Sequence, residues 1–223
     1  MSANEVLSVV AGGVITILVT IAVEVLRRPK LRLIPAGAVD ATYEAGRPAQ
    51  RSRYLYVNLA NDPLPWFARW MSRNAALQCT GTITFHHLDG QRFFSRHMPV
   101  RFSRTPEPVP FHFAVGEIAG VFFDPSRINA ESRIDVYPGE HTPLDIAAKF
   151  DSEEDAYGWS NLSYFSNPPW RNPDWKLPRG RYLVAISISS SGQKREGLFR
   201  LLNEAGPSDF RLEPAQRGDR VSA

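Results

Sequence analysis

The sequence predicts a mainly β protein in which a single N-terminal transmembrane helix precedes an antiparallel β-sandwich. Three observations predict this fold class. Residues Val6 to Val23 carry no charged side chain, several later segments alternate apolar and polar residues, and the 18 prolines and 15 glycines are spread along the chain. Alternation with a period of two is typical of half-buried strands, and dispersed turn-forming residues are typical of many short strands.

The uncharged run has the length of a membrane span. Its eighteen residues extend about 27 Å as an α-helix, close to the roughly 30 Å hydrocarbon core of a bilayer. The run is rich in β-branched residues, which a helix in lipid tolerates because every backbone group must be paired internally there. We expect residues 1–28 to form the anchor, and Pro29 to end the helix.

The alternatives to a span are a cleaved signal peptide and the core helix of a soluble protein. A signal peptide should begin with positive charge, but the residues before the run carry only Glu5. The Ala-x-Ala motif at Ala36–Ala38 also lies too far beyond the apolar run to mark a cleavage site. A core helix should have a polar face, which this run lacks.

Basic residues follow the run and none precedes it. Such residues stay on the cytoplasmic side of a span. We therefore expect the C-terminal domain to face the cytosol from a prokaryotic-type plasma (inner) membrane, and the basic residues to contact lipid headgroups. These headgroup candidates are Arg27, Arg28, Lys30 and Arg32.

Small and polar residues recur at every fourth position of the span. This spacing places neighbours on adjacent turns of a helix and allows a second helix to approach closely. We expect the anchor to self-associate through this face, although the same pattern arises by chance in short anchors. The helix-packing candidates are Ser8, Gly12, Thr16 and Thr20.

The rest of the chain is long enough for one domain with its own core. We expect a juxtamembrane segment with the first strand over residues 29–52, the sandwich over residues 53–213, and a flexible tail over residues 214–223. The net charge is +3, and four basic residues lie next to the span. The domain itself is therefore near neutral, which argues against a nucleic-acid partner.

Four segments show the alternation most clearly. We expect Asp89-Gly90 to form a two-residue hairpin turn and Ser190–Gly192 to turn another strand back on itself. The predicted same-face sets are Leu55, Val57 and Leu59; Leu77, Cys79, Gly81, Ile83 and Phe85; Leu144, Ile146, Ala148 and Phe150; and Tyr182, Val184, Ile186 and Ile188.

The segment Leu177–Val184, which reads LPRGRYLV and precedes a hairpin, resembles the penultimate strand of immunoglobulin-like and fibronectin-type-III-like sandwiches. The resemblance implies an antiparallel immunoglobulin-like β-sandwich in which Tyr182 bonds back to the preceding loop. The Cys–Trp–Cys core of antibody domains is absent, so an antibody-type domain is not expected. A closed β-barrel is the alternative architecture.

An aromatic and basic segment interrupts two predicted strands. If residues 66–73 form two helical turns, the aromatic residues share one face and the arginines another, as in segments that lie in lipid headgroups. The alternative, which we favour, is a short helix that caps the sandwich and buries its aromatic rings. The candidate interface residues are Trp66, Phe67, Arg69, Trp70 and Arg73.

A second aromatic cluster lies among prolines in the later part of the chain. Such rings can form a platform for a small ligand. The alternative, which we favour, is a long connection pinned by its own side chains. The candidate platform residues are Tyr157, Trp159, Tyr164, Trp170 and Trp175.

Catalytic and metal-binding signatures are missing from the sequence. The five histidines lack the paired spacing of a zinc site, and the chain has one cysteine. No nucleophile elbow, phosphate loop or dinucleotide fingerprint is present. We therefore expect no enzyme, cofactor or metal.

The sequence leaves two functions open. The first is a membrane-anchored, cytosol-facing interaction module that binds a protein partner and self-associates through its helix. The second is a membrane effector whose β-domain binds a small molecule and drives helix association in the bilayer.

Overall fold

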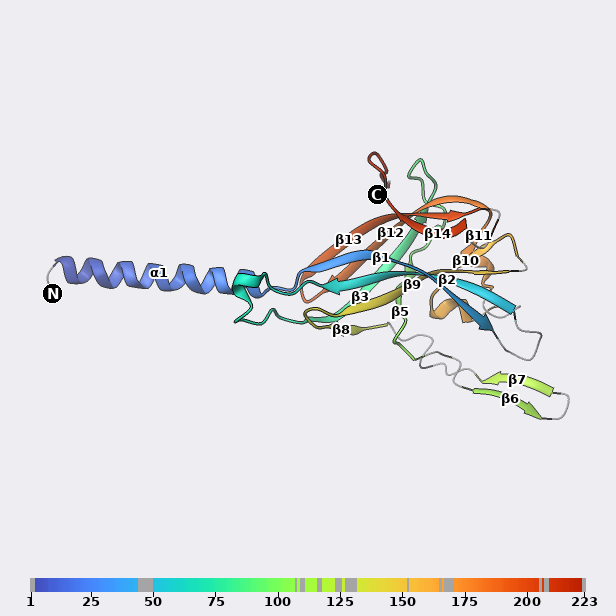
Figure 1. Cartoon of the computed structure of the whole chain (residues 1–223), viewed down its shortest axis with the longest axis horizontal. Helices are drawn as coiled ribbons and strands as arrows, with labels where there is room; N and C mark the ends of the chain where they lie inside the picture. The colour runs from blue at the N-terminus through green and yellow to red at the C-terminus, as the bar shows by residue number, and fades with distance from the viewer. Residues whose placement is uncertain are drawn as a thin grey trace.

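The computed structural model describes residues 3–43, 50–106, 108, 111–115, 118–122, 126, 132–151, 153–164, 166, 171–204, 206 and 209–221. Helix α1 (Ala3–Arg27) projects from a body made of β-strands (Figure 1). Short 3-10 helices lie in the connections of this body: η1 (Trp66–Ala68), η2 (Asn161–Tyr164) and η3 (Pro173–Trp175).

The described strands form two antiparallel sheets that face each other, and a separate hairpin. The first sheet runs in the order β1 (Leu31–Tyr43), β2 (Gln50–Asn61), β9 (His141–Phe150), β10 (Ala156–Gly158) and β11 (Lys176–Leu177), with β5 (Arg101–Phe102) beside β9. The second runs in the order β14 (Phe210–Pro214), β13 (Gln193–Asn203), β12 (Gly180–Ser190), β3 (Ala76–His86) and β4 (Met98–Pro99), with β8 (Ile134–Val136) beside β3. The hairpin consists of β6 (Phe111–Val115) and β7 (Ile118–Phe122). The predicted mainly β, two-sheet architecture is confirmed.

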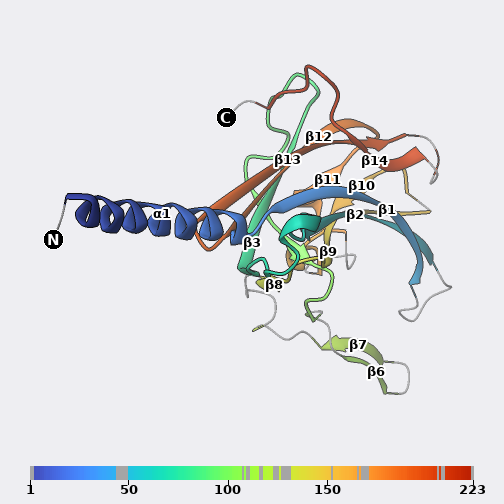
Figure 2. The same ribbon diagram turned by 60° about the vertical axis from the view of Figure 1, so that its left-hand side comes forward.

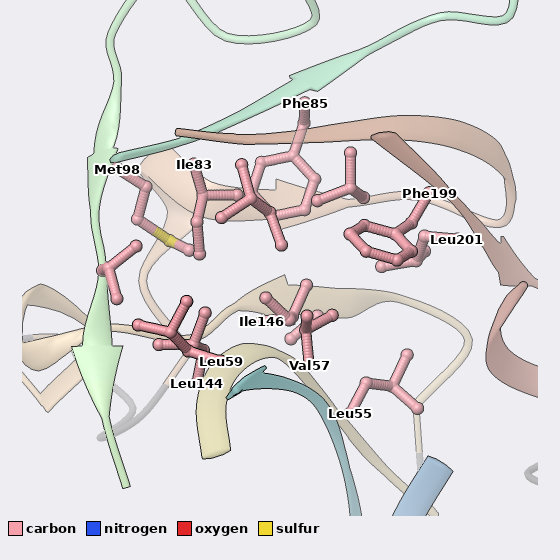
Figure 3. Packing of buried hydrophobic residues seen from close by; sticks show 14 of the residues in the cluster. Leu55, Val57, Leu59, Ile83, Phe85, Met98, Leu144, Ile146, Phe199 and Leu201 are labelled. Atoms are coloured by element: carbon pink, nitrogen blue, oxygen red, sulfur yellow. The ribbon is translucent and has the colours of Figure 1, made fainter. Parts of the chain in front are cut away.

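The core lies between the two sheets (Figure 3). The first sheet contributes Leu55, Val57, Leu59, Leu144 and Ile146, and the second contributes Ile83, Phe85, Phe199 and Leu201 together with Met98 of β4. All of these side chains are buried. Burial of each large apolar side chain contributes about 1.5–3 kcal/mol, so this layer supplies most of the drive for the two sheets to pack.

Strand β12 follows its predicted alternation. Tyr182, Val184, Ile186 and Ile188 are all buried. The strand turns into β13 through Ser191 and Gly192, whose φ angles of 38° and 81° are the left-handed values that a tight hairpin turn requires. The Tyr182 hydroxyl donates a 2.8 Å hydrogen bond to the Pro178 carbonyl, the contact that the resemblance implies, and burial raises the pKa of Tyr182 to about 12.

The prediction that Leu77 shares the buried face of β3 is wrong. Its side chain is 47% exposed, whereas Ala76 and Cys79 are buried. Gln78 has a φ of 49°, and the register with β8 shifts between Ala76 and Cys79. An inserted residue in a strand turns the following side chains to the opposite face, so the alternation that starts correctly at Cys79 cannot be extended back to Leu77.

The alternation predicted for β9 is also wrong beyond Ile146. Leu55 pairs with Ala147 and Tyr56 with Asp145, which leaves Ile146 as an extra residue in a β-bulge. The bulge keeps Leu144, Ile146 and Ala147 in the main core. It turns Ala148 and Phe150 into a second cluster on the other face of the sheet.

The turn at Asp89-Gly90 is one residue longer than predicted. The backbone N–H of His87 donates to the Gln91 carbonyl at 2.9 Å, which closes a loop of Leu88, Asp89 and Gly90. Gly90 has a φ of 90°, the left-handed value expected of the last residue in a three-residue hairpin loop.

Candidate membrane-proximal site

Helix α1 is long and apolar enough to cross a membrane, and its apolar window from Val10 to Arg27 has no buried residues. It projects from the sandwich (Figures 1 and 2). Val14, Ile15 and Leu18 are exposed on it. The core-helix alternative is therefore wrong, because a core helix of such composition would be covered by the domain.

The small-residue face of α1 is open. The Thr16 hydroxyl donates to the Gly12 carbonyl and the Thr20 hydroxyl to the Thr16 carbonyl, each at 2.9 Å. Ser8 and Gly12 are exposed, and no atom would lie within 4 Å of a Cβ added at Gly12. The threonine hydroxyls are thus satisfied inside the helix, so any close approach of a second helix depends on small size and not on these donors.

The joint between α1 and β1 is three residues long, Arg28 to Lys30. The connection between β2 and β3 is hydrogen bonded to it. The Asn74 N–H donates to the Arg27 carbonyl at 2.7 Å, and an Arg73 guanidinium nitrogen donates to the Arg28 carbonyl at 2.5 Å. These bonds satisfy carbonyls at the end of the helix, which have no partner within the helix itself.

The buried side chain of Asn61 holds this joint together. Its Oδ1 accepts the Lys30 N–H at 3.0 Å. Its Nδ2 donates to the carbonyls of Asn74 and Val136, both at 3.1 Å. One carboxamide therefore links the helix–strand joint, the β2–β3 connection and β8.

The aromatic segment of the β2–β3 connection lies at the same place (Figure 1). Instead of two helical turns it forms the single 3-10 turn η1. Trp66, Phe67 and Trp70 are 79%, 59% and 80% exposed. The expectation that these rings cap the core is wrong, because Leu64 and Ala68 are the buried residues of this segment and the rings extend from its other side. We call Trp66, Phe67 and Trp70 the aromatic tip.

Basic side chains surround the end of α1. Arg32 is paired with Asp62 at 3.1 Å, so part of its charge is compensated inside the protein. The Nε atoms of Arg27 and Arg73 are buried and have no hydrogen-bond partner among the described residues. We call the other basic residues the collar: Arg27, Arg28, Lys30, Arg69 and Arg73.

The structure separates the predicted ligand platform into two places. Tyr157, Trp159 and Tyr164 are buried together in the second cluster, where the Trp159 ring lies 5.6 Å from that of Tyr164. Trp175 is buried in the main core against Phe94. Trp170 lies outside the described residues. The four described rings are packed against the protein and present no open platform to a ligand.

A buried ion pair that the sequence analysis missed lies beside the second cluster. Arg101 and Asp145 are both buried and joined by a hydrogen bond. Ser103 Oγ donates to Asp145 at 2.6 Å, and the Arg101 guanidinium lies 5.8 Å from the centre of the Tyr164 ring. Only the pairing of β5 with β9 reveals the contact, since the two residues lie far apart in the sequence.

The outer face of the second sheet holds a groove of about 580 Å³, lined among others by Thr82, His97, Ala185 and Lys194. This volume lies within the roughly 300–1,000 Å³ range of small-molecule sites. This groove offers space for the ligand-sensing alternative, whereas the described rings of the aromatic cluster are buried. Among the described residues, no group of three His, Cys, Asp or Glu side chains could hold a metal ion.

Comparisons of the chain with models of protein families, with curated proteins and with solved structures found no match.

Proposed function

We propose that the chain is a single-pass membrane protein whose β-sandwich is an interaction module on the cytosolic side. The observation that carries this proposal is the combination of an exposed apolar helix with a short, hydrogen-bonded joint. An apolar helix of this length is stable away from its own domain only where the surroundings are apolar. The joint then holds the sandwich directly at the membrane surface.

The collar supports the cytosolic orientation. Arg27, Arg28 and Lys30 lie at the C-terminal end of the helix, and the β2–β3 connection adds Arg73, which is hydrogen bonded to the Arg28 carbonyl. Basic residues near a span remain on the cytoplasmic side of a plasma (inner) membrane. Folding thus adds a further basic residue to those that follow the span in the sequence.

The hairpin β6–β7 supports the interaction role. Among the described strands, β6 and β7 pair only with each other. They project from the body at the end remote from α1 (Figures 1 and 2), and neither carries a Lys, Arg, Asp or Glu. A two-stranded apolar hairpin has open edges that can pair with a strand of another protein, so we place the protein partner there.

The immunoglobulin-like relationship is part of the same proposal. The hydrogen bond from Tyr182, near the start of β12, to the Pro178 carbonyl in the preceding loop supports it. Such sandwiches are common interaction modules, but the fold alone does not specify a partner.

Two charged substitutions in the helix test the anchoring. Ile15→Lys combined with Leu18→Lys places two charges in the middle of the span, where each costs about 2.5–3.5 kcal/mol. We expect the unchanged chain to stay in the membrane pellet after carbonate extraction and the charged variant to be released. Ile15→Val with Leu18→Ile is the matched control and should behave as the unchanged chain. Release of the unchanged chain by carbonate would overturn the anchoring.

A photo-crosslinker tests the partner site. Placed at position 113 in β6, it should give a defined adduct in intact membranes. Placed at the exposed Arg195 of β13, it should not. The same adducts from both positions, or none from position 113, would contradict the assignment of the hairpin.

A further inference from the structure

We propose that the aromatic tip inserts into the headgroup layer of the bilayer that α1 crosses, and so forms a second membrane contact that fixes the tilt of the sandwich. This inference rests on the proposed anchoring. It adds a lipid-binding surface, formed by Trp66, Phe67 and Trp70, that lies outside the span.

The position of the β2–β3 connection places the tip at the membrane surface. Asn74 and Arg73 are hydrogen bonded to the carbonyls of Arg27 and Arg28, at 2.7 and 2.5 Å. The base of the connection therefore lies level with the last turn of α1. Each headgroup layer is roughly 5–7.5 Å thick, because the bilayer measures about 40–45 Å with its headgroups and about 30 Å without them. A tryptophan side chain that extends from this base is long enough to enter that layer.

The composition of the tip suits the interface. Trp66 and Phe67 pack edge to face with ring centroids 6.0 Å apart, so the two rings form one apolar unit. Trp70 is exposed beside the same turn, while Leu64 and Ala68 hold the segment to the domain. Tryptophan is enriched at membrane interfaces because its ring is apolar and its N–H donates a hydrogen bond.

The charges around the tip favour lipid over other occupants. Arg69 belongs to the same segment and is exposed, as are Arg28 and Lys30 at the end of α1. Anionic headgroups attract such basic clusters within about a Debye length of the surface. A protein partner at this position would have to displace lipid from the base of α1, whereas headgroups are already present there.

Two contacts restrict the domain more than one. With three residues between α1 and β1 and hydrogen bonds across this joint, the helix and the sandwich can still tilt together in the bilayer if the tip is free in water. Insertion of the tip opposes this tilt and holds the sandwich at a defined angle to the membrane.

Fluorescence quenching in vesicles tests the insertion. The full chain is reconstituted into phosphatidylcholine and phosphatidylglycerol vesicles, with and without bromine on the acyl chains, and tryptophan emission is recorded. Helix α1 contains no tryptophan, so its own insertion gives no signal. We expect brominated lipid, and not aqueous iodide, to quench the emission of the unchanged chain.

The variants assign the signal to the tip. Trp66→Phe with Trp70→Phe should lose the lipid-quenched emission, whereas Trp159→Phe, a change in the buried second cluster, should retain it. Quenching of Trp66 and Trp70 by iodide, or protection of both from iodide and bromine, would overturn the proposal even if carbonate extraction retains the chain. Release of the chain by carbonate would overturn the anchoring itself.

Discussion

At the scale of single residues, the joint depends on Asn61. We expect Asn61→Ala to leave the Lys30 N–H and the Asn74 and Val136 carbonyls without their partner. A buried group left unsatisfied costs about 1–3 kcal/mol, so the free energy of unfolding should fall by at least that amount. Chemical denaturation of the full chain in nanodiscs measures the change.

Asn58→Ala is the matched control for this prediction. Asn58 lies on the same strand, is only half-buried, and makes none of the three bonds. Its substitution should change the free energy of unfolding by no more than about 0.5 kcal/mol. Equal losses at the two positions would contradict the role assigned to Asn61.

The core prediction concerns the faces of β3 and β12. Ile83→Ala and Ile186→Ala each remove a buried side chain and should cost about 2–5 kcal/mol. Leu77→Ala removes a side chain of similar size that is exposed, and should be close to neutral. Thermal melting distinguishes the three variants, and a melting loss for Leu77→Ala equal to that of Ile83→Ala would mean that the faces are assigned wrongly.

The buried imidazole of His86 should make the free energy of unfolding depend on pH. This imidazole contacts the Gly90 carbonyl and the Thr84 hydroxyl at 3.0 and 2.9 Å. Burial lowers the pKa of His86 below its ordinary value of 6.5. Below pH 6.5 the unfolded state therefore binds more protons than the folded state. The contribution of His86 to the free energy of unfolding is complete above pH 6.5 and is lost as the pH falls below that value.

Substitution isolates the contribution of this group. Denaturation of the unchanged chain at pH 7.5 and 5.5 should show the loss at the lower pH, and His86→Gln should reduce it. His97→Gln makes the same chemical change at an exposed position and should keep the full loss. An equal pH dependence in all three proteins would contradict the assignment.

Single residues also show which strand faces could be predicted from the sequence and which could not. Periodicity assigned the faces of β12 correctly because the strand is regular from Tyr182 to Ile188. It could not foresee the positive φ of Gln78 or the extra residue at Ile146, since neither residue type signals a bulge. Each irregularity reverses the faces beyond it, which is why Leu77, Ala148 and Phe150 were misplaced.

At the scale of elements, α1 was the most predictable part. Hydropathy and Pro29 are local signals, and the helix indeed ends at Arg27. The exposure of the tip was not predictable, because the same pattern of aromatic and basic residues occurs in buried caps and in interfacial turns. The exposed rings of Trp66, Phe67 and Trp70 exclude the buried cap, and sequence alone does not give their exposure.

The open face of α1 carries a prediction about assembly. Gly12→Leu should weaken self-association of the anchor, because a leucine at the closest approach of two helices pushes their backbones apart. Leucine is more apolar than glycine, so insertion itself should persist. Crosslinking in membranes compares this variant with Val10→Leu, which introduces the same residue at an exposed position of the same helix. An unchanged yield in Gly12→Leu would mean that the helix is only a tether.

At the scale of the whole molecule, strand pairing joins distant segments. Ile83 pairs with Ile186, and Tyr56 pairs with Asp145. Alternation identified most of the long strands and the two-sheet class, but it carries no information on which strands become neighbours. The Arg101–Asp145 pair and the division of the aromatic residues into two clusters follow from that strand pairing. They could therefore not be predicted from the sequence.

The two ends of the molecule carry different features. Helix α1 and the β2–β3 connection, which carries the aromatic tip, lie at one end, and the hairpin β6–β7 lies at the other (Figure 1). In the proposed function, the sandwich lies between the membrane and the hairpin, and the hairpin faces the cytosol. The central claim is therefore that the sandwich lies on the cytosolic side of the membrane.

Reporter fusions after Ala223 test that claim most directly. One reporter is active only in the cytosol and the other only after export, and both are expressed in a bacterial host. Because the collar lies C-terminal to the span, we predict activity of the cytosolic reporter alone. Activity of the export-dependent reporter, with an inactive cytosolic one, would contradict the orientation and restore the signal-peptide alternative.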